Sequence, residues 1–244
     1  MMESRLQDQV IVITGAGGGI GRALSVALAK EGARIALCGG NNEDNLNETA
    51  TSVRKAGEEV FVLPGDLRDD GFLFSCMDRI AQDFGNPDVL INNAGIALST
   101  PFEDTTPEQL DRIYSINVRA PFILCQKALP FLRLSGNAAI INISSVVGHK
   151  GYPLQAAYAA SKHALLGFSK SLANEVYKEN IRVHTICPGG VFTDMVKIAR
   201  PDLKPDGMIL PEEIAEIAVF LLKFRGSAVI DEISVHREGK EPFQ

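Results

Sequence analysis

Residues 10–24 read VIVITGAGGGIGRAL, a continuous apolar run followed by a glycine-rich turn and the start of a helical pattern. An apolar run without polar alternation is typical of a strand in a parallel sheet, because helices cover both faces of such a sheet. Glycines let the backbone turn sharply between the strand and the helix that follows. The stretch therefore predicts the first strand, turn and helix of a doubly wound α/β sheet.

The same alternation of strand and helix continues along the chain and implies right-handed crossovers. We predict one α/β domain over residues 1–244, with a doubly wound, Rossmann-type sheet and helices on both of its faces. The predicted strands are Val10–Thr14, Arg34–Cys38, Val60–Pro64, Val89–Asn92, Ala138–Ser144, Arg182–Cys187 and Val229–Val235. The predicted helices are Gly19–Glu31, Asn45–Ala56, Asp69–Phe84, Pro107–Leu134, Ala156–Glu179 and Pro211–Phe224.

The composition argues against two kinds of partner. The 244 residues are 45% hydrophobic and 22% charged, with a net charge of −6. Nucleic acid requires a basic patch, which this acidic chain with interspersed charges does not offer, so we expect no nucleic-acid partner. No apolar run approaches the ~20 residues of a membrane helix, and the N-terminal residues lack a signal-peptide pattern, so we expect no membrane partner.

The cysteines and histidines carry no recognisable spacing. Cys38, Cys76, Cys125 and Cys187 are scattered without a C-x-x-C pair, and three of them lie in apolar segments. Buried free thiols are the favoured interpretation. We therefore expect a cytoplasmic protein and no metal site. We interpret the four histidines as surface or structural residues: His149, His163, His184 and His236.

In a doubly wound sheet the ligand lies beyond the carboxyl ends of the strands, where the strand order reverses. The glycine-rich turn follows the first strand, and its Gly15, Gly19 and Gly21 would let a pyrophosphate approach the backbone. The N-terminus of the next helix favours that negative charge. The spacing is G-x-x-x-G-x-G rather than G-x-G-x-x-G, so the alternative is a plain tight turn.

Polar residues follow other strands. Asp66 is positioned to accept a hydrogen bond from an adenine amino group, or else to cap the next helix. Asn92-Asn93-Ala94-Gly95 offers small residues and amides for a ribose. Ser144 and Ser145 end the fifth strand, where a hydroxyl can bind a substrate carbonyl; an ordinary turn serine is the alternative. Thr193, after a Pro-Gly-Gly turn, can hydrogen-bond a carboxamide.

Tyr158 and Lys162 lie four residues apart in a helical segment, so they share one face of the helix. An ammonium close to a phenol favours the phenolate and lowers the phenol's pKa. Such a phenol can exchange a proton with a reacting oxygen. The alternative is that Tyr158 and Lys162 are simply exposed neighbours on a helix, without a catalytic role. Asn117 is a polar residue in an apolar helical stretch, where it could bend the helix or bind a water. The alternative is an ordinary asparagine that caps a helix or is solvated.

Together these pieces resemble the short-chain dehydrogenase/reductase family over about residues 8–195. The motifs are Thr14-Gly15-x3-Gly19-x-Gly21, Asn92-Asn93-Ala94-Gly95, Asn117, Ser145, Tyr158-x3-Lys162 and Pro188-Gly189. The resemblance implies seven mostly parallel strands, an NAD(P) cofactor, and a catalytic tetrad of Asn117, Ser145, Tyr158 and Lys162. In this scheme Tyr158 is the general acid/base, Ser145 polarises the carbonyl, Lys162 lowers the phenol pKa and binds the ribose, and Asn117 holds a water.

The resemblance also implies a set of cofactor contacts. These are Gly15, Gly19, Ile20, Gly21, Asp66, Leu67, Asn93, Ala94, Gly95, Tyr158, Lys162, Pro188, Gly189, Val191 and Thr193. The cofactor is NADP or NAD, and the end of the second strand favours NADP. Gly39 and Gly40 stand where an acid would bind the ribose hydroxyls and repel a 2′-phosphate. Asn41, Asn42 and Arg22 are candidate hydrogen-bond donors to a 2′-phosphate. Glu43 and Asp44 would repel that phosphate unless they face water.

The expected activity is the interconversion of a secondary alcohol and a ketone, with a short substrate lid around residues 195–210. The alternatives are a 3-oxoacyl-[acyl-carrier-protein] reductase and a non-catalytic dinucleotide-binding protein. Carrier proteins are acidic and need a basic docking site, but residues 130–139 hold only Arg133, which favours a free small molecule. The helices Pro107–Leu134 and Ala156–Glu179 carry excess apolar residues, such as Leu165, Leu166, Phe168, Leu172 and Val176. By resemblance, these helices pair in a homodimer or homotetramer.

Overall fold

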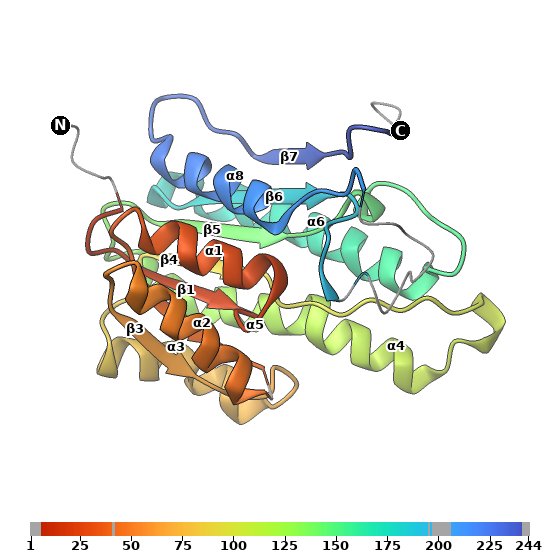
Figure 1. Cartoon of the computed structure of the whole chain (residues 1–244), viewed down its shortest axis with the longest axis horizontal. Helices are drawn as coiled ribbons and strands as arrows, with labels where there is room; N and C mark the ends of the chain where they lie inside the picture. The colour runs from red at the N-terminus through yellow and green to blue at the C-terminus, as the bar shows by residue number, and fades with distance from the viewer. Residues whose placement is uncertain (1–5, 41, 195, 197–205, 241–244) are drawn as a thin grey trace.

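The structure, a computed structural model, describes residues 6–40, 42–194, 196 and 206–240. It contains one seven-stranded sheet in the order β3-β2-β1-β4-β5-β6-β7, and every neighbouring pair of strands is parallel (Figure 1). The doubly wound fold is thus confirmed. The strands are β1 Val10–Thr14, β2 Arg34–Cys38, β3 Val60–Leu63, β4 Val89–Asn92, β5 Ala139–Ile143, β6 Arg182–Pro188 and β7 Glu232–Val235.

Helices cover both faces of the sheet. They are α1 Gly19–Ala29, α2 Glu43–Lys55, α3 Asp70–Asp83, α4 Pro107–Tyr114, α5 Ala120–Leu132, α6 Ala156–Val176 and α8 Pro211–Lys223. Shorter turns are the 3₁₀ segments η1 Phe102–Asp104, η3 Val146–Gly148 and η4 Tyr177–Glu179, and the π turn η2 Ser115–Arg119. Among the described residues, no helix has both the length and the apolar character to span a membrane.

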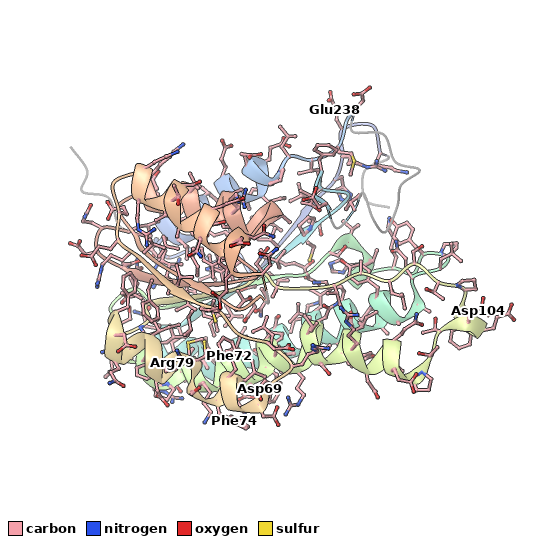
Figure 2. The ribbon with its side chains drawn as sticks, turned by 60° about the horizontal axis from the view of Figure 1, so that its bottom comes forward. Asp69, Phe72, Phe74, Arg79, Asp104 and Glu238 are labelled. Carbon is pink, nitrogen blue, oxygen red and sulfur yellow. The ribbon has the colours of Figure 1, made fainter. Side chains whose placement is uncertain are left out.

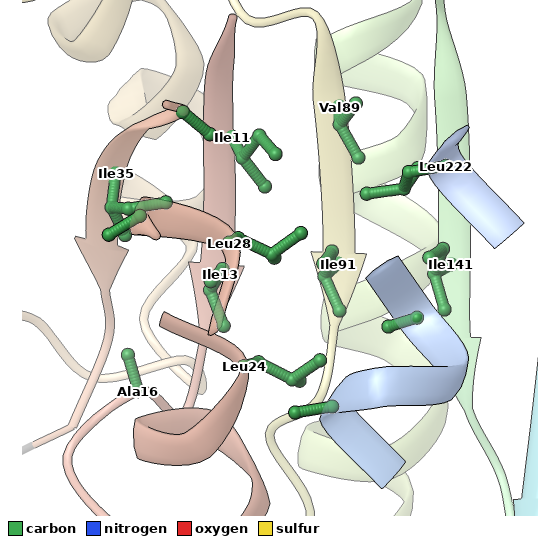
Figure 3. Close-up of a cluster of buried hydrophobic side chains, with 14 of the residues drawn as sticks. Ile11, Ile13, Ala16, Leu24, Leu28, Ile35, Val89, Ile91, Ile141 and Leu222 are labelled. Atoms are coloured by element: carbon green, nitrogen blue, oxygen red, sulfur yellow. The ribbon is translucent and has the colours of Figure 1, made fainter. Parts of the chain in front are cut away.

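Strands β1 to β6 send alternate side chains to two separate cores. Ile11 and Ile13 of β1 point to the face covered by α1, α2 and α8, where Leu24 and Leu28 pack on them (Figure 3). The residue between them, Val12, faces the core beneath α3, α5 and α6. Because both faces are buried, β1 is buried at every position and apolar from Val10 to Ile13, which explains its unbroken run of hydrophobic residues.

Side-chain caps fix where two helices begin. Asn42 accepts a hydrogen bond from the Asn45 amide, so α2 starts two residues earlier than predicted. Asp69 accepts from the amides of Gly71 and Phe72 and caps α3. The alternative role of Asp66 as a helix cap is therefore wrong. Phe72 of the same helix is buried, whereas Phe74 points outward with 47% of its surface exposed (Figure 2).

The predicted helix Pro107–Leu134 is not one regular α-helix. It consists of α4, the π turn η2 and α5, and Asn117 is buried in the middle of the π turn. The apolar pattern does not reveal this change, because a π turn adds one residue to a turn without interrupting the helix.

The apolar residues of α6, which were expected to indicate association, are covered within one copy of the chain. Leu165, Leu166, Leu172 and Val176 are all buried within one copy of the chain. Phe168 is partly buried and its ring lies 5.1 Å from that of Phe122. Leu172, Val176 and Phe168 belong to the core between α5, α6 and the sheet, and Leu165 and Leu166 are buried elsewhere in the chain, so these residues do not indicate a partner.

Candidate active site

A cavity of about 510 Å³ lies beyond the carboxyl ends of the strands, at the point where β1 separates β2 from β4. This is where the order of the strands reverses, and the size suits a small-molecule site. Fourteen predicted contact residues line it: Gly15, Gly19, Ile20, Asp66, Leu67, Asn93, Ala94, Gly95, Tyr158, Lys162, Pro188, Gly189, Val191 and Thr193. Gly21, Asn117 and Ser145 lie just behind this lining.

The glycine turn leaves no room for larger side chains. A Cβ on Gly21 would lie 2.3 Å from the Gly15 carbonyl oxygen and 2.7 Å from Asn93 Nδ2. Gly19 has a φ of +51°, in the region that favours glycine, and its Cβ would lie 2.9 Å from Thr193. Gly21 therefore acts by letting α1 pack closely on the turn, while Gly19 lines the cavity itself.

The N-terminus of α1 provides unused hydrogen-bond donors. Its capping position is Gly18, which has no side chain to satisfy the first amides of the helix, and Gly18, Gly19 and Ile20 all line the cavity. Uncapped amides at a helix N-terminus, together with the helix dipole, bind phosphate groups well. The residues present therefore fit the pyrophosphate of a dinucleotide.

Asn93 braces the glycine turn. Its Nδ2 donates to the carbonyl oxygens of Thr14 and Gly15, at 2.9 and 3.1 Å. Its backbone amide donates to Thr14 Oγ1 at 3.1 Å, and that of Ala94 donates to the same oxygen at 3.0 Å. These contacts tie the end of β4 to the end of β1 and hold the floor of the cavity in place.

Tyr158 lies in the first turn of α6 and forms a hydrogen bond with the side chain of Ser145. Burial raises the pKa of the Tyr158 phenol above its ordinary value, and the Ser145 contact acts in the opposite direction. The Ser145 hydroxyl also donates to the Pro188 carbonyl at 3.3 Å. Its neighbour Ser144 instead bonds the Lys162 carbonyl, so Ser145 is the serine that meets the phenol.

Lys162 is 4% exposed, and its Nζ donates to the Ile143 carbonyl oxygen at 2.9 Å. The same Nζ lies 5.9 Å from the centre of the Tyr158 ring. Burial lowers the pKa of Lys162 to about 8. The expectation that Lys162 gives the phenol a lowered pKa is not met in this structure, because desolvation of Tyr158 dominates and the ammonium is directed to the end of β5.

Asn117 uses its side chain to join three segments. Its Oδ1 accepts from the Ile96 amide at 2.9 Å, and its Nδ2 donates to the Ile96 carbonyl at 2.9 Å and to Ser161 Oγ at 3.0 Å. Both of its N–H groups are thus occupied, so the side chain positions the loop after β4 against α6. The water expected at Asn117 would therefore have to bind its backbone or the second lone pair of Oδ1.

The cavity lining also includes residues that the sequence pattern does not predict, among them Arg68, Arg112 and Ile116. Arg68 pairs with Asp66 at 2.6 Å and covers the side chain expected to meet adenine. Arg112 and Ile116 lie four residues apart on one helical face, immediately before Asn117. That i, i+4 spacing is the signal that would have found them.

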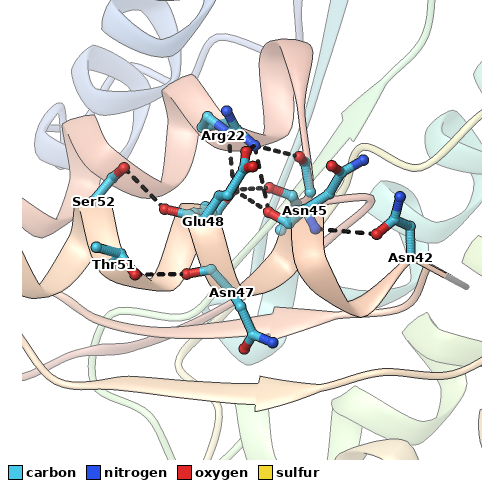
Figure 4. Close-up of polar contacts among 10 residues, drawn as sticks. Arg22, Asn42, Asn45, Asn47, Glu48, Thr51 and Ser52 are labelled. Carbon is cyan, nitrogen blue, oxygen red and sulfur yellow. Dashed lines mark hydrogen bonds and ion pairs between the residues drawn. The ribbon is translucent and has the colours of Figure 1, made fainter.

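Arg22 does not face the cavity. Its Nη2 pairs with Glu48 of α2 at 2.8 Å, and its Nε donates to Thr49 Oγ1 at 3.1 Å (Figure 4). The proposed contact of Arg22 with a 2′-phosphate is therefore wrong, because α2 holds the guanidinium. Asn41 and most of the expected lid, residues 195–210, lie outside the described residues.

Comparisons with known proteins agree with this geometry. The sequence profile of the family described as short chain dehydrogenase matches residues 9–204. Levodione reductase of Leifsonia aquatica is 34% identical over 215 residues, which are 87% of this chain and 79% of that protein. A 3-oxoacyl-[acyl-carrier-protein] reductase of Thermotoga maritima is 31% identical over 94% of this chain and 96% of its own length. A crystal structure of a short chain dehydrogenase from Shigella flexneri, complexed with NADP, has a TM-score of 0.88 at 30% identity and covers 96% of this chain and 98% of its own.

Proposed function

Because the chain belongs to the short chain dehydrogenase family, we propose that it interconverts a secondary alcohol and a ketone with Tyr158 as the proton-exchanging group. It is an NAD(P)-dependent oxidoreductase acting on CH–OH groups. The observation that carries the assignment of Tyr158 is its position in the cavity wall, hydrogen-bonded to Ser145 and close to Lys162. We propose that the whole chain acts as one dinucleotide-binding and catalytic domain.

In carbonyl reduction, the Tyr158 hydroxyl donates its proton to the carbonyl oxygen and the Ser145 hydroxyl orients that oxygen. When bound, the nicotinamide supplies or accepts the hydride. The N-terminal amides of α1 hold the pyrophosphate, and Lys162 holds the nicotinamide ribose. Asn117 positions the loop after β4, so that Gly95 lies beside both Asn117 and Lys162.

The raised pKa of Tyr158 predicts different pH profiles for the two directions of the reaction. The phenol keeps its proton through neutral pH, which suits the reduction of a ketone, whereas alcohol oxidation needs the phenolate. We expect kcat/KM for reduction to be flat between pH 6 and 8. For oxidation it should rise by about tenfold per pH unit while the phenol is mostly protonated. Initial rates in both directions test this; a rate of reduction that falls steeply between pH 6 and 8 would contradict it.

We propose NADP as the preferred cofactor, because neither Gly39 nor Gly40 offers an acid that would repel a 2′-phosphate. Both glycines have positive φ, +77° and +97°, so any side chain here strains the backbone. Gly39→Asp must therefore be compared with Gly39→Asn, which has the same shape and no charge. A like charge near the phosphate costs about 1–4 kcal/mol at 4 Å, so we expect Gly39→Asp to bind NADPH about tenfold more weakly than Gly39→Asn.

Fluorescence titration of NADPH and NADH with the unmodified protein and both variants gives the dissociation constants. NADH should bind the two variants about equally. Tighter binding of NADH than of NADPH by the unmodified protein would overturn the preference.

The second candidate, a 3-oxoacyl-[acyl-carrier-protein] reductase, is favoured by the nearly full-length match to the Thermotoga protein. Against it, the sole basic residue of the expected docking segment, Arg133, pairs with Glu179 at 2.6 Å. An acidic carrier protein would have to displace Glu179. A rate comparison of acetoacetyl thioesters with cyclic and open-chain ketones distinguishes the two functions.

We propose that the protein is cytoplasmic, since its four cysteines are free and buried thiols, and that it assembles as a homodimer or homotetramer. The support for assembly now comes from exposed apolar side chains on α4 and α5, namely Leu110, Tyr114 and Phe122. Light scattering at micromolar concentration should give at least twice the mass of the 26.3 kDa chain. A stable monomer would contradict this part of the proposal.

A further inference from the structure

Three residues with metal-binding side chains meet beside the active site, although the sequence spacing predicts no metal site. The ligand atoms of His149, Cys187 and Glu232 all lie within 4.8 Å of one another. Among the described residues this is the one group of three or more histidine, cysteine or acidic side chains with that proximity. The three come from distant segments: the end of η3, the end of β6 and the start of β7.

The sheet itself brings two of these side chains together. Glu232 is paired with Thr185, two residues before Cys187 on the neighbouring strand β6. Residues two apart on a strand share a face, so Cys187 and Glu232 are diagonal neighbours on one side of the sheet. His149 leaves η3 above this face, and its Nε2 lies 2.7 Å from Glu232 Oε1. Strand register and a short turn, rather than flexible tails, fix the group.

We propose that His149, Cys187 and Glu232 form a binding site for a borderline-soft divalent cation of the Zn²⁺ class. A thiolate, an imidazole and a carboxylate are the ligands that Zn²⁺ uses, whereas Mg²⁺ avoids sulfur. Around Zn²⁺ at 2.0–2.3 Å, tetrahedral N, O and S ligands are about 3.3–3.6 Å apart, so ligand atoms that are up to 4.8 Å apart must approach by at most roughly 1.5 Å. A water completes the coordination, and the Cys187 thiol releases its proton to solvent as the metal binds.

Solvent reaches the site from one side. The side chains of His149 and Glu232 are 38% and 26% exposed, and Cys187 lies buried beneath them. Two ammonium groups oppose a bound cation: that of Lys162 acts on the Cys187 sulfur, and that of Lys170 lies 3.8 Å from Glu232 Oε2. A bound cation would displace Lys170, whose side chain is 66% exposed and can turn into water. Because of these opposing charges, we expect the site to bind the cation more weakly than a structural zinc site does.

Occupancy of this site acts on the catalytic residues. Cys187 directly precedes Pro188, whose carbonyl oxygen accepts a hydrogen bond from the Ser145 hydroxyl. The backbone amide of Ser145 donates a hydrogen bond to the Cys187 sulfur. The Lys162 ammonium acts electrostatically on the same sulfur. A cation bound to Cys187 therefore repels the Lys162 ammonium. It also shifts the Cys187–Pro188 segment, to which Ser145 is hydrogen-bonded. The site is inhibitory: the cation lowers turnover without occupying the cofactor cavity.

The test is titration of the full-length, metal-free protein with Zn²⁺ by calorimetry, and with Cd²⁺ by ultraviolet absorption of the thiolate–metal bond. We expect one equivalent to bind, with a new thiolate–Cd²⁺ band and no heat from Mg²⁺. Cys187→Ser should abolish the band, and His149→Gln should weaken Zn²⁺ by at least about tenfold, as expected for loss of a ligand. Cys125→Ser is the matched control, because Cys125 is equally buried but contacts Asn92 rather than a metal-binding group.

Each outcome decides the proposal. It is overturned if wild type shows no binding or no thiolate band, or if Cys187→Ser and His149→Gln bind Zn²⁺ as wild type does. It is also overturned if Cys125→Ser removes the band. Since these readouts do not depend on turnover, they stand or fall separately from the proposed oxidoreductase activity. Weaker inhibition of ketone reduction by Zn²⁺ in His149→Gln than in wild type then tests the coupling to Ser145.

Discussion

Replacement of Tyr158 by phenylalanine is expected to lower kcat by about 10²–10⁴-fold, the contribution of a positioned proton donor. Phenylalanine keeps the ring that fills the wall of the cavity and removes only the hydroxyl that meets Ser145. Cofactor affinity should change little, because the proposed site for the pyrophosphate is the N-terminus of α1 and not the phenol. Steady-state rates of ketone reduction, together with a cofactor titration, measure both effects.

A matched control for this variant is Tyr152→Phe, which removes a hydroxyl from a tyrosine that is 39% exposed and does not line the cavity. That variant should retain wild-type kcat. Retention of more than about a tenth of the wild-type rate by Tyr158→Phe is less loss than a positioned proton donor supplies. It would show that Tyr158 is not the proton donor of the reaction.

The second large effect is expected for Lys162→Met, which keeps the length of the side chain and removes its charge. Loss of the ammonium should reduce kcat/KM by about 10²-fold or more, since the proposed mechanism gives Lys162 the nicotinamide ribose and a positive charge in the cavity wall. Folding should not suffer, because the lysine side chain is almost completely buried and its charge is costly to desolvate. The variant should thus be no less stable than wild type at neutral pH while nearly inactive.

The pH dependence of stability checks the same lysine independently. Its pKa is about 8 in the folded protein, below the ordinary 10.5, so between these values the unfolded chain binds more protons. The stability of wild type relative to Lys162→Met should therefore rise with pH across that interval and level off above it. Urea unfolding of both proteins at several pH values measures the difference. A relative stability that falls over this interval would show that the ammonium is not desolvated in the folded state.

Much of the fold follows from local patterns. The apolar runs of β1, β2 and β4 match the observed strands because both faces of the sheet are buried, so that no polar alternation obscures them. Residues such as Gly15 and Asp66 were found because the carboxyl ends of parallel strands share one edge. This argument needs only the order of the elements along the chain.

What the sequence could not reveal depends on contacts between distant segments. Arg22 forms an ion pair with Glu48 of the next helix and so points away from the cavity. The π turn at Asn117 is stabilised by contacts with Ile96 and Ser161, neither of which is nearby in the sequence. Cys187 and Glu232 meet only through strand register. Hydrophobic periodicity carries no information about such pairs, which explains why the cavity was predicted more reliably than the partners of its charged residues.

The most direct measurement of the central claim is the transfer of deuterium from [4-²H]NADPH, deuterated on either face of the nicotinamide, to a ketone. A panel of cyclic diketones, acetoacetate and acetoacetyl thioesters serves as substrate, and mass spectrometry locates the label in the alcohol. The account predicts that one face of the cofactor delivers one deuterium to the carbinol carbon, with the hydroxyl proton coming from solvent through Tyr158. Consumption of NADPH without deuterium at that carbon, or label transfer that continues undiminished in Tyr158→Phe, would contradict it.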